Sequence, residues 1–140
     1  MTPVLLDTDC IVALLDASEQ YHGQCAEVLA ALEDPLLTCE TVIAESCYLL
    51  RGLPGAPAAV LENVERGVFQ IPYRLTDGAA RLRKLLATYA DVPMDLADAC
   101  LVDMASDLRT GRILTLDRDF QIYRWGRNRP FELLIDLQGV

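Results

Sequence analysis

The hydrophobic pattern of the chain begins with a short apolar run that ends in a carboxylate. Residues 4–6 are apolar, Asp7 follows, and a second stretch with apolar residues at helical spacing comes directly after it. This pattern predicts a buried strand over about 3–7 and a helix over about 8–16. Ligands of open α/β sheets bind beyond the carboxyl ends of the strands, so Asp7 stands where chemistry is expected.

Extended and helical patterns alternate along the rest of the chain. Extended apolar patterns recur at 36–39, 68–75, 112–116 and 133–137. Helical patterns recur at 18–32, at 41–51, in a segment that runs to about Arg66, at 76–90 and at 95–109. Because strands alternate with helices, we expect an α/β fold in three layers, with a parallel sheet of about five strands covered by helices on both faces.

Polar residues and a glycine mark where the predicted helices begin and end. Ser18, Thr41, Thr76 and Asp95 are suitable N-cap residues, because a short polar side chain accepts a hydrogen bond from the first turn of a helix. Gly111 is expected to close the last of these helices, since a glycine often ends a helix in the left-handed conformation.

The length and composition are those of a single domain with a full apolar core. The chain has 140 residues, of which 52% are hydrophobic, and we expect one domain over 1–140. No stretch approaches the roughly 20 apolar residues of a membrane span, and the N-terminus shows no secretory signal. The five cysteines include no CxxC pair, which favours reduced core thiols and a cytoplasmic protein.

The charge of the chain is acidic overall but unevenly distributed. A formal net charge of −9 argues against a general nucleic-acid coat protein. Residues 118–129 nevertheless hold one acid, Asp119, and four arginines. The arginines are Arg118, Arg124, Arg127 and Arg129. Such a basic patch suits the binding of a phosphate backbone. A solvated turn whose arginines pair with surface acids explains the same composition, and both interpretations stay open.

Four acidic residues stand where the predicted fold brings carboxylates together. Asp7 and Asp117 each follow a strand, and the carboxyl ends of parallel strands lie at one edge of the sheet. Glu45 interrupts the apolar stripe of the helix over 41–51. Asp98 shares a helix face with apolar residues such as Leu101. The fold therefore predicts an acidic cluster at one edge of the sheet.

Four nearly buried carboxylates in one pocket need compensating positive charge. An unpaired buried carboxylate costs several kcal/mol, and neighbouring acids raise each other's pKa values. The single lysine and the single histidine, Lys84 and His22, lie outside these segments. A divalent cation supplies the charge, and all-oxygen ligation favours Mg²⁺ or Mn²⁺ over zinc. Such a cluster suits two-metal hydrolysis of a phosphodiester bond.

The four acids also have explanations that involve no chemistry. Asp95 and Asp98 fit a capping box with Asp in place of Glu. Glu45 is placed to pair with an arginine, and Asp7 and Asp117 can cap the elements that follow them.

Four further acids lie beside the cluster in the sequence. Asp9 and Asp119 each lie two residues beyond a strand-end acid. They either support a metal site through a neighbouring ligand or serve only as N-caps, and this choice stays open. Asp103 and Asp107 fall on the helix face opposite Asp98, where we expect solvent.

Together these residues resemble the acidic motifs of PIN-domain ribonucleases. The matching segments follow the family's order and spacing and cover nearly the whole chain. They are Asp7-Thr8-Asp9 after an apolar strand, Glu45 within a helix, Leu96-Ala97-Asp98-Ala99, and Leu114-Thr115-Leu116-Asp117-Arg118-Asp119-Phe120. Each motif alone is weak, whereas the ordered set of four is specific. The subgroup that looks most similar is the VapC-type toxins of bacterial toxin–antitoxin pairs, which are single PIN domains of about this length.

The resemblance implies an endoribonuclease that depends on Mg²⁺ or Mn²⁺. By position, Asp7, Glu45, Asp98 and Asp117 match the family's catalytic and metal-binding acids. The resemblance further implies a homodimer and a cognate antitoxin that blocks the cleft. Asp9 departs from the family pattern, because many members have Ser, Thr or Asn there.

The supporting roles follow from this hypothesis. Asp9, Asp95 and Asp119 are candidates for supporting the metal ligands indirectly. No histidine is placed to act as general base, so the metal would have to activate the attacking water. Arg118, Arg124 and Arg127 are expected to hold the RNA backbone without reading its sequence.

Three alternatives to this function remain. Asp7-Thr8-Asp9 also matches the D-x-D opening of haloacid-dehalogenase phosphatases, but Cys10 and Ile11 follow where that family usually has Gly and then Thr or Val. A catalytically silent PIN domain that binds RNA or protein would carry the same acids. A PIN domain that acts in RNA processing rather than as a toxin would do so as well.

Overall fold

A five-stranded parallel sheet forms the middle layer of the computed structural model, which describes residues 2–137. The strand order is β3-β2-β1-β4-β7, with every neighbouring pair parallel. The strands are β1 (Val4–Leu6), β2 (Leu36–Leu37), β3 (Phe69–Gln70), β4 (Arg112–Leu114) and β7 (Glu132–Leu133). The expected α/β fold with about five parallel strands is confirmed.

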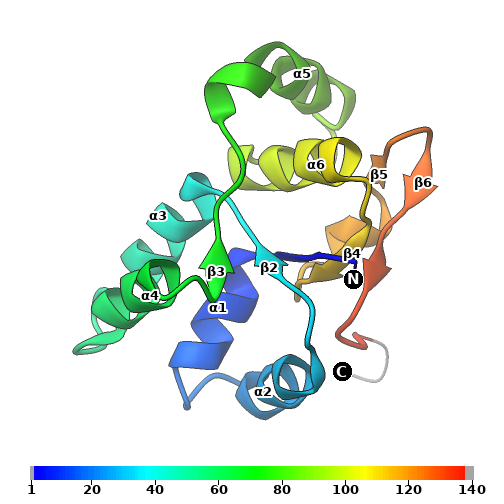
Figure 1. Cartoon of the computed structure of the whole chain (residues 1–140). Coiled ribbons are helices and arrows are strands. Elements are labelled where there is room, and N and C mark those ends of the chain that lie inside the picture. The colour runs from blue at the N-terminus through cyan, green and yellow to red at the C-terminus, as the bar shows by residue number, and fades with distance from the viewer. Residues whose placement is uncertain (1, 138–140) are drawn as a thin grey trace.

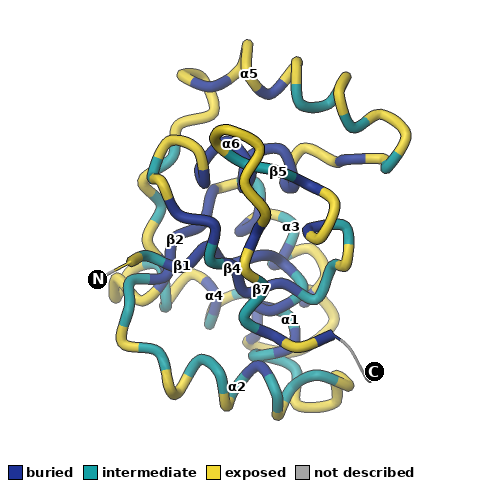
Figure 2. The backbone as a smooth tube through the Cα atoms, turned by 90° about the vertical axis from the view of Figure 1, so that its right-hand side faces the viewer, coloured by how far each residue is buried: buried dark blue, intermediate teal, exposed yellow. Residues whose placement is uncertain are grey.

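Helices cover both faces of this sheet. The helices are α1 (Thr8–Leu15), α2 (His22–Ala31), α3 (Glu40–Leu49), α4 (Ala56–Glu65), α5 (Leu75–Thr88) and α6 (Leu96–Leu108). Figures 1 and 2 show α5 and α6 on one side of the strands and α1, α2 and α4 on the other. None of the described helices is long and apolar enough to cross a membrane.

The central strand explains why the chain opens with an uninterrupted apolar run. All three residues of β1 are completely buried, because helices cover both of its faces. Leu5 pairs with Leu37 on one side and Ile113 on the other, so the three central strands meet through aliphatic residues. Both β1 and β4 end at the same edge of the sheet, which brings the residues that follow them together.

Several predicted helix ends are wrong by a few residues. Ser18 lies in a turn before α2, where its amide and hydroxyl both donate to the Asp16 carboxylate, and α2 begins only at His22. Thr41 and Thr76 lie inside the first turns of α3 and α5 rather than at their caps. Asp95 does cap α6, as predicted.

The end of α6 also differs from the prediction. Arg109, with φ of 55°, takes the left-handed conformation that closes the helix, and Gly111 does not. Gly111 serves a different purpose, since a Cβ there would lie 2.1 Å from the indole Nε1 of Trp125. The glycine therefore lets the indole ring pack against the backbone.

The extended segments are shorter than predicted, and one hairpin was not foreseen. Only Phe69–Gln70 of the 68–75 segment pairs with the sheet, and the last strand is Glu132–Leu133 rather than 133–137. Between β4 and β7 lie a 3₁₀ turn, η1 (Arg118–Gln121), and an antiparallel hairpin. The hairpin strands are β5 (Arg124–Trp125) and β6 (Arg129–Pro130).

An ion pair between an exposed arginine and a buried carboxylate joins α5 to α6 where solvent was expected. Asp103 is only 4% exposed and accepts hydrogen bonds from Arg81 Nε at 2.8 Å and the Tyr73 hydroxyl at 2.8 Å. Gly78 makes room for this contact, because a Cβ there would lie 2.6 Å from Asp103 Oδ2. The expectation that Asp103 faces solvent is wrong because α5 covers that side of α6, whereas Asp107 is exposed as predicted.

We expect Asp103→Ala to lower the free energy of unfolding by about 2–3 kcal/mol, because it removes hydrogen bonds to a charged acceptor. Asp107→Ala is the matched control on the same helix, and a change within about 0.5 kcal/mol is expected there. Urea denaturation of both variants measures the difference. Equal midpoints would show that the Asp103 contacts do not hold α5 in place.

Candidate active site

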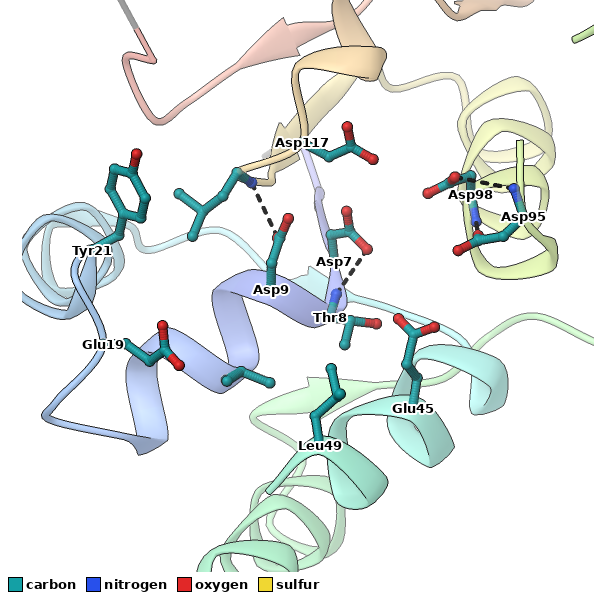
Figure 3. A pocket seen from close by; sticks show the side chains of 12 residues that line it. Asp7, Thr8, Asp9, Glu19, Tyr21, Glu45, Leu49, Asp95, Asp98 and Asp117 are labelled. Carbon is teal, nitrogen blue, oxygen red and sulfur yellow. Dashed lines mark hydrogen bonds between the residues drawn. The ribbon is translucent and has the colours of Figure 1, made fainter. Parts of the chain in front are cut away.

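An acidic pocket of about 350 Å³ lies at the carboxyl edge of β1 and β4, between α3 and α6. Figure 3 shows its lining. Seven carboxylate side chains contribute to it, and no Lys, Arg or His is among the described residues that line it. The seven are Asp7, Asp9, Glu19, Glu45, Asp95, Asp98 and Asp117. The structure thus brings all four of the principal predicted acids to one cavity.

Asp7 is fixed by two hydrogen bonds at the junction of β1 and α1. Its Oδ1 accepts from the Thr8 amide at 2.8 Å, which makes it the N-cap of α1. Its Oδ2 accepts from the Thr115 hydroxyl at 2.7 Å. The same hydroxyl accepts from the Asp117 amide at 3.0 Å, so Thr115 links the two acids that follow β1 and β4.

Thr115 was not singled out from the sequence. The available signal is a polar residue within the otherwise apolar run Ile113-Leu114-Thr115-Leu116. Thr115 is completely buried, and a buried hydroxyl needs partners on both its donor and its acceptor side. Asp7 and the Asp117 amide are those partners.

Asp9 lies in the first turn of α1 and lines the pocket, but it is not the N-cap. Its Oδ1 accepts a hydrogen bond from the Leu116 amide at 3.0 Å. Asp9 therefore ties α1 to the segment that follows β4, close to both Asp7 and Asp117. Of the two open explanations for Asp9, the N-cap explanation is wrong because Asp7 occupies that position.

Asp95 and Asp98 form the predicted capping box at the start of α6. The Asp98 amide donates to Asp95 Oδ1 at 2.8 Å, and the Asp95 amide donates to Asp98 Oδ2 at 3.2 Å. Asp98 Oδ2 also accepts from the buried Tyr123 hydroxyl at 3.3 Å. Capping does not remove Asp98 from the pocket, which it lines together with Asp95 (Figure 3).

Glu45, Asp117 and Asp119 complete the acidic edge. Glu45 extends from the middle of α3 into the pocket (Figure 3). Asp117 is the N-cap of η1, since its Oδ1 accepts from the Asp119 amide at 2.9 Å. Asp119 itself does not line the pocket. Its negative charge nevertheless helps to raise the pKa of Asp117.

Burial and mutual repulsion raise the pKa values of four carboxylates that line the pocket. Burial first, and then the neighbouring acids, raise the pKa of Asp98 to about 8. Burial likewise raises the pKa of Asp9 to about 7. The pKa of Asp7 is raised by burial and by Asp9, and the pKa of Asp117 is raised chiefly by burial. A cation in the pocket would reverse these shifts, because it favours the charged carboxylates.

The donor set fits a hard divalent cation in its chemistry. Only oxygen ligands are offered, and the buried Thr8 hydroxyl is the single buried side-chain N or O atom within residues 2–137 that has no hydrogen-bond partner. No three acidic, His or Cys side chains of the described part already converge as a closed ligand set. Asp98 Oδ2 already accepts the capping bond from the Asp95 amide, so ligation through that oxygen would compete with the cap.

The predicted RNA-binding arginines lie outside the acidic pocket. The Arg118 guanidinium donates to the Leu137 carbonyl at 2.9 Å. The Arg124 guanidinium donates to the carbonyls at the end of η1, including that of Gln121 at 2.9 Å. Arg127 lies in the hairpin turn, beside the opposite end of α6 from Asp98.

The sequence also matches the model of a known protein family. A family model of the PIN domain matches residues 4–126. The chain belongs to the PIN domain family. The family assignment expected from the ordered acidic motifs is thereby confirmed, and the haloacid-dehalogenase alternative is set aside.

Individual PIN proteins resemble this chain over most of its length. Ribonuclease VapC26 of Mycobacterium tuberculosis (strain ATCC 25618 / H37Rv) is 32% identical over 120 residues, which cover 82% of this chain and 87% of VapC26. The crystal structure of Mycobacterium tuberculosis VapC20, a sarcin-ricin loop cleaving toxin, superposes with a TM-score of 0.80 at 20% identity. That match covers 91% of this chain and 99% of VapC20 and shows the fold they share.

The stability of the PIN domain without metal should fall as the pH rises from about 5 to 8. The carboxyl groups of Asp9 and Asp98, with pKa values of about 7 and about 8, keep protons that the unfolded chain has already released near pH 4. Loss of these protons as the pH rises through this window therefore lowers the free energy of unfolding. Added Mg²⁺ should raise the Tm most at pH 8, because it binds only the charged carboxylates.

Thermal melts in EDTA and in Mg²⁺ at several pH values measure this effect. Asp98→Asn should flatten the pH dependence in EDTA, since it removes one of the acids with a raised pKa. A Tm that rises between pH 5 and 8 in EDTA would contradict the account of the pocket.

Proposed function

We propose that this PIN domain is a divalent-metal-dependent endoribonuclease and acts in the cytoplasm as a toxin of the VapC type. One observation carries the proposal, namely seven carboxylates around a single cavity with no basic side chain among the described residues that line it. The similarity to Ribonuclease VapC26 supports RNA as the substrate. The similarity to a VapC toxin fold supports the toxin class.

Four acids would hold the metal. Asp7, Glu45, Asp98 and Asp117 come from four different elements and line one pocket, and Mg²⁺ or Mn²⁺ is the hard ion that such oxygen donors prefer. When bound, the metal supplies charge neutralisation at the phosphoryl oxygens and lowers the pKa of a coordinated water. We assign supporting roles to Asp9, Asp95 and Asp119, which hold neighbouring backbone or add charge beside the ligands.

The chain itself orients the site. The Thr115 hydroxyl bonds both the Asp7 carboxylate and the Asp117 amide, so one side chain positions the two strand-end acids. The N-termini of α1 and α6 both begin at pocket residues, and the positive ends of their dipoles favour a phosphodiester anion there. No histidine is among the described pocket residues, so a carboxylate of the pocket would have to accept the proton of the attacking water.

The proposal includes an antitoxin and a second copy of the chain as partners. Leu49 of α3 lines the pocket and is 54% exposed, and the neighbouring Tyr48 is 62% exposed. Apolar surface beside a strongly acidic cavity suits a protein that covers the cavity. A homodimer is the assembly that the VapC type of toxin implies.

Cleavage of a single-stranded RNA should require Mg²⁺ or Mn²⁺ and should stop in EDTA. Asp7→Asn and Asp117→Asn should each lower the cleavage rate by at least about 100-fold, because even residues behind the ligands are worth 10–100-fold in metal sites. Gel analysis of the labelled products measures the rate and shows whether the cuts are internal.

Asp107→Asn is the control for these variants, since Asp107 is exposed on α6 away from the pocket, and it should cleave at the wild-type rate. Cleavage that survives both EDTA and Asp7→Asn would exclude the metal mechanism. RNA binding with no cleavage under any metal would instead identify a catalytically silent PIN domain.

A further inference from the structure

A second cavity, opposite in charge to the first, lies at the other end of α6. It measures about 400 Å³ and is formed by the end of α6 and the β5–β6 hairpin. Figure 1 shows the hairpin beside the C-terminal end of the helix. Three arginines line the cavity and no acidic residue of the described chain does so. The lining residues are Ser106, Arg109, Trp125, Gly126, Arg127 and Arg129.

The backbone around this cavity is firmly held. The Gly126 amide donates to Ser106 Oγ at 2.9 Å, which fixes the hairpin turn on α6. The Trp125 indole donates to the Pro130 carbonyl at 3.0 Å across the hairpin, and its ring packs against Gly111. These hydrogen bonds therefore hold the backbone that carries the arginines in place on α6.

The three arginines have no partner for their charge. Within residues 2–137, the guanidinium groups of Arg109, Arg127 and Arg129 donate no hydrogen bond and form no ion pair, although Arg129 lies over the Trp125 ring at 5.3 Å. By contrast, Arg81 and Arg112 are both paired with carboxylates. Three guanidinium groups without a carboxylate partner therefore line one cavity on a chain of net charge −9.

The chemistry of the cavity selects a multiply oxygenated anion. Each guanidinium offers five N–H donors in a planar fork, a geometry that matches phosphate oxygens. We propose that this cavity binds a phosphodiester group of the RNA strand outside the acidic pocket. The proposal rests on RNA being the substrate, as proposed above, and assigns the backbone contact to Arg109, Arg127 and Arg129. The guanidinium group of Arg124 is instead engaged by backbone carbonyls.

The distance between the two cavities suits one RNA strand. Asp98 lines one cavity and Ser106 lines the other, and these residues are eight positions apart on α6, which corresponds to about 12 Å of helix. A stacked strand advances about 3.4 Å per nucleotide, so about four nucleotides span that length. A strand held by the arginines thus reaches the acids, and the favourable contacts offset the repulsion between RNA and the acidic pocket.

The test compares two triple variants with the same change of charge. One replaces Arg109, Arg127 and Arg129 by Gln, and the control replaces Arg66, Arg74 and Arg83 by Gln on other exposed surfaces. Binding of a fluorescent single-stranded RNA is measured by anisotropy in EDTA, where no cleavage interferes. The cavity variant should bind at least about tenfold more weakly, and the slope of log K against log salt should fall by about 2, at about 0.7 per lost phosphate contact.

Each other outcome would overturn the proposal. Equal loss of affinity in both triple variants with unchanged thermal melts would show a general charge effect. Weakened binding of inorganic phosphate with unchanged RNA affinity would show a site for free phosphate. Displacement of RNA by poly-glutamate at equal residue concentration would point to an acidic protein partner.

The assay separates this proposal from the proposed function. Wild-type protein that cleaves RNA, while the cavity variant binds and cleaves RNA equally well, contradicts the cavity and leaves the ribonuclease intact. Wild-type protein that binds RNA through the cavity but cleaves none in Mg²⁺ or Mn²⁺ contradicts the ribonuclease and leaves the cavity intact.

Discussion

Buried negative charge at one edge of the sheet is the constraint on which the rest of the structure depends. The parallel strands β1 and β4 end at the same edge of the sheet, so Asp7, directly after β1, and Asp117, three residues after β4, meet there. Their burial is tolerated because each carboxylate accepts hydrogen bonds from backbone or hydroxyl groups. The same bonds start α1 and η1, so the acids that crowd the pocket also fix its walls.

The molecule separates its charges along α6. The acids gather at the N-terminal end of this helix, and three arginines gather at its C-terminal end. This polarity agrees with the helix dipole, because acidic residues near a helix N-terminus and basic residues near its C-terminus both interact favourably with it. The arrangement gives an acidic protein one surface that attracts polyanions and another that attracts cations.

The sequence predicted those features that follow from local chemistry. The apolar run before Asp7, the ordered acids and the Asp95–Asp98 capping box were all readable, because each depends on neighbours in the chain. The burial of Asp103 depends on α5 folding over α6, and no local pattern records that contact. The Tyr123 hydroxyl and Thr115 were missed for the same reason, since their partners are 25 and 108 residues away.

The double use of Asp98 makes the pocket and the start of α6 a linked system. Asp98 Oδ2 accepts from the Asp95 amide and from the Tyr123 hydroxyl, so any ligand that recruits this oxygen competes with the first turn of the helix. By thermodynamic linkage, a change that stabilises that turn weakens the binding of such a ligand. The bound ligand in return destabilises the turn by the same free energy. Ligation through Asp98 Oδ2 would thus couple the affinity of the acidic pocket to the stability of a helix end, which a sequence change can alter without touching the ligands.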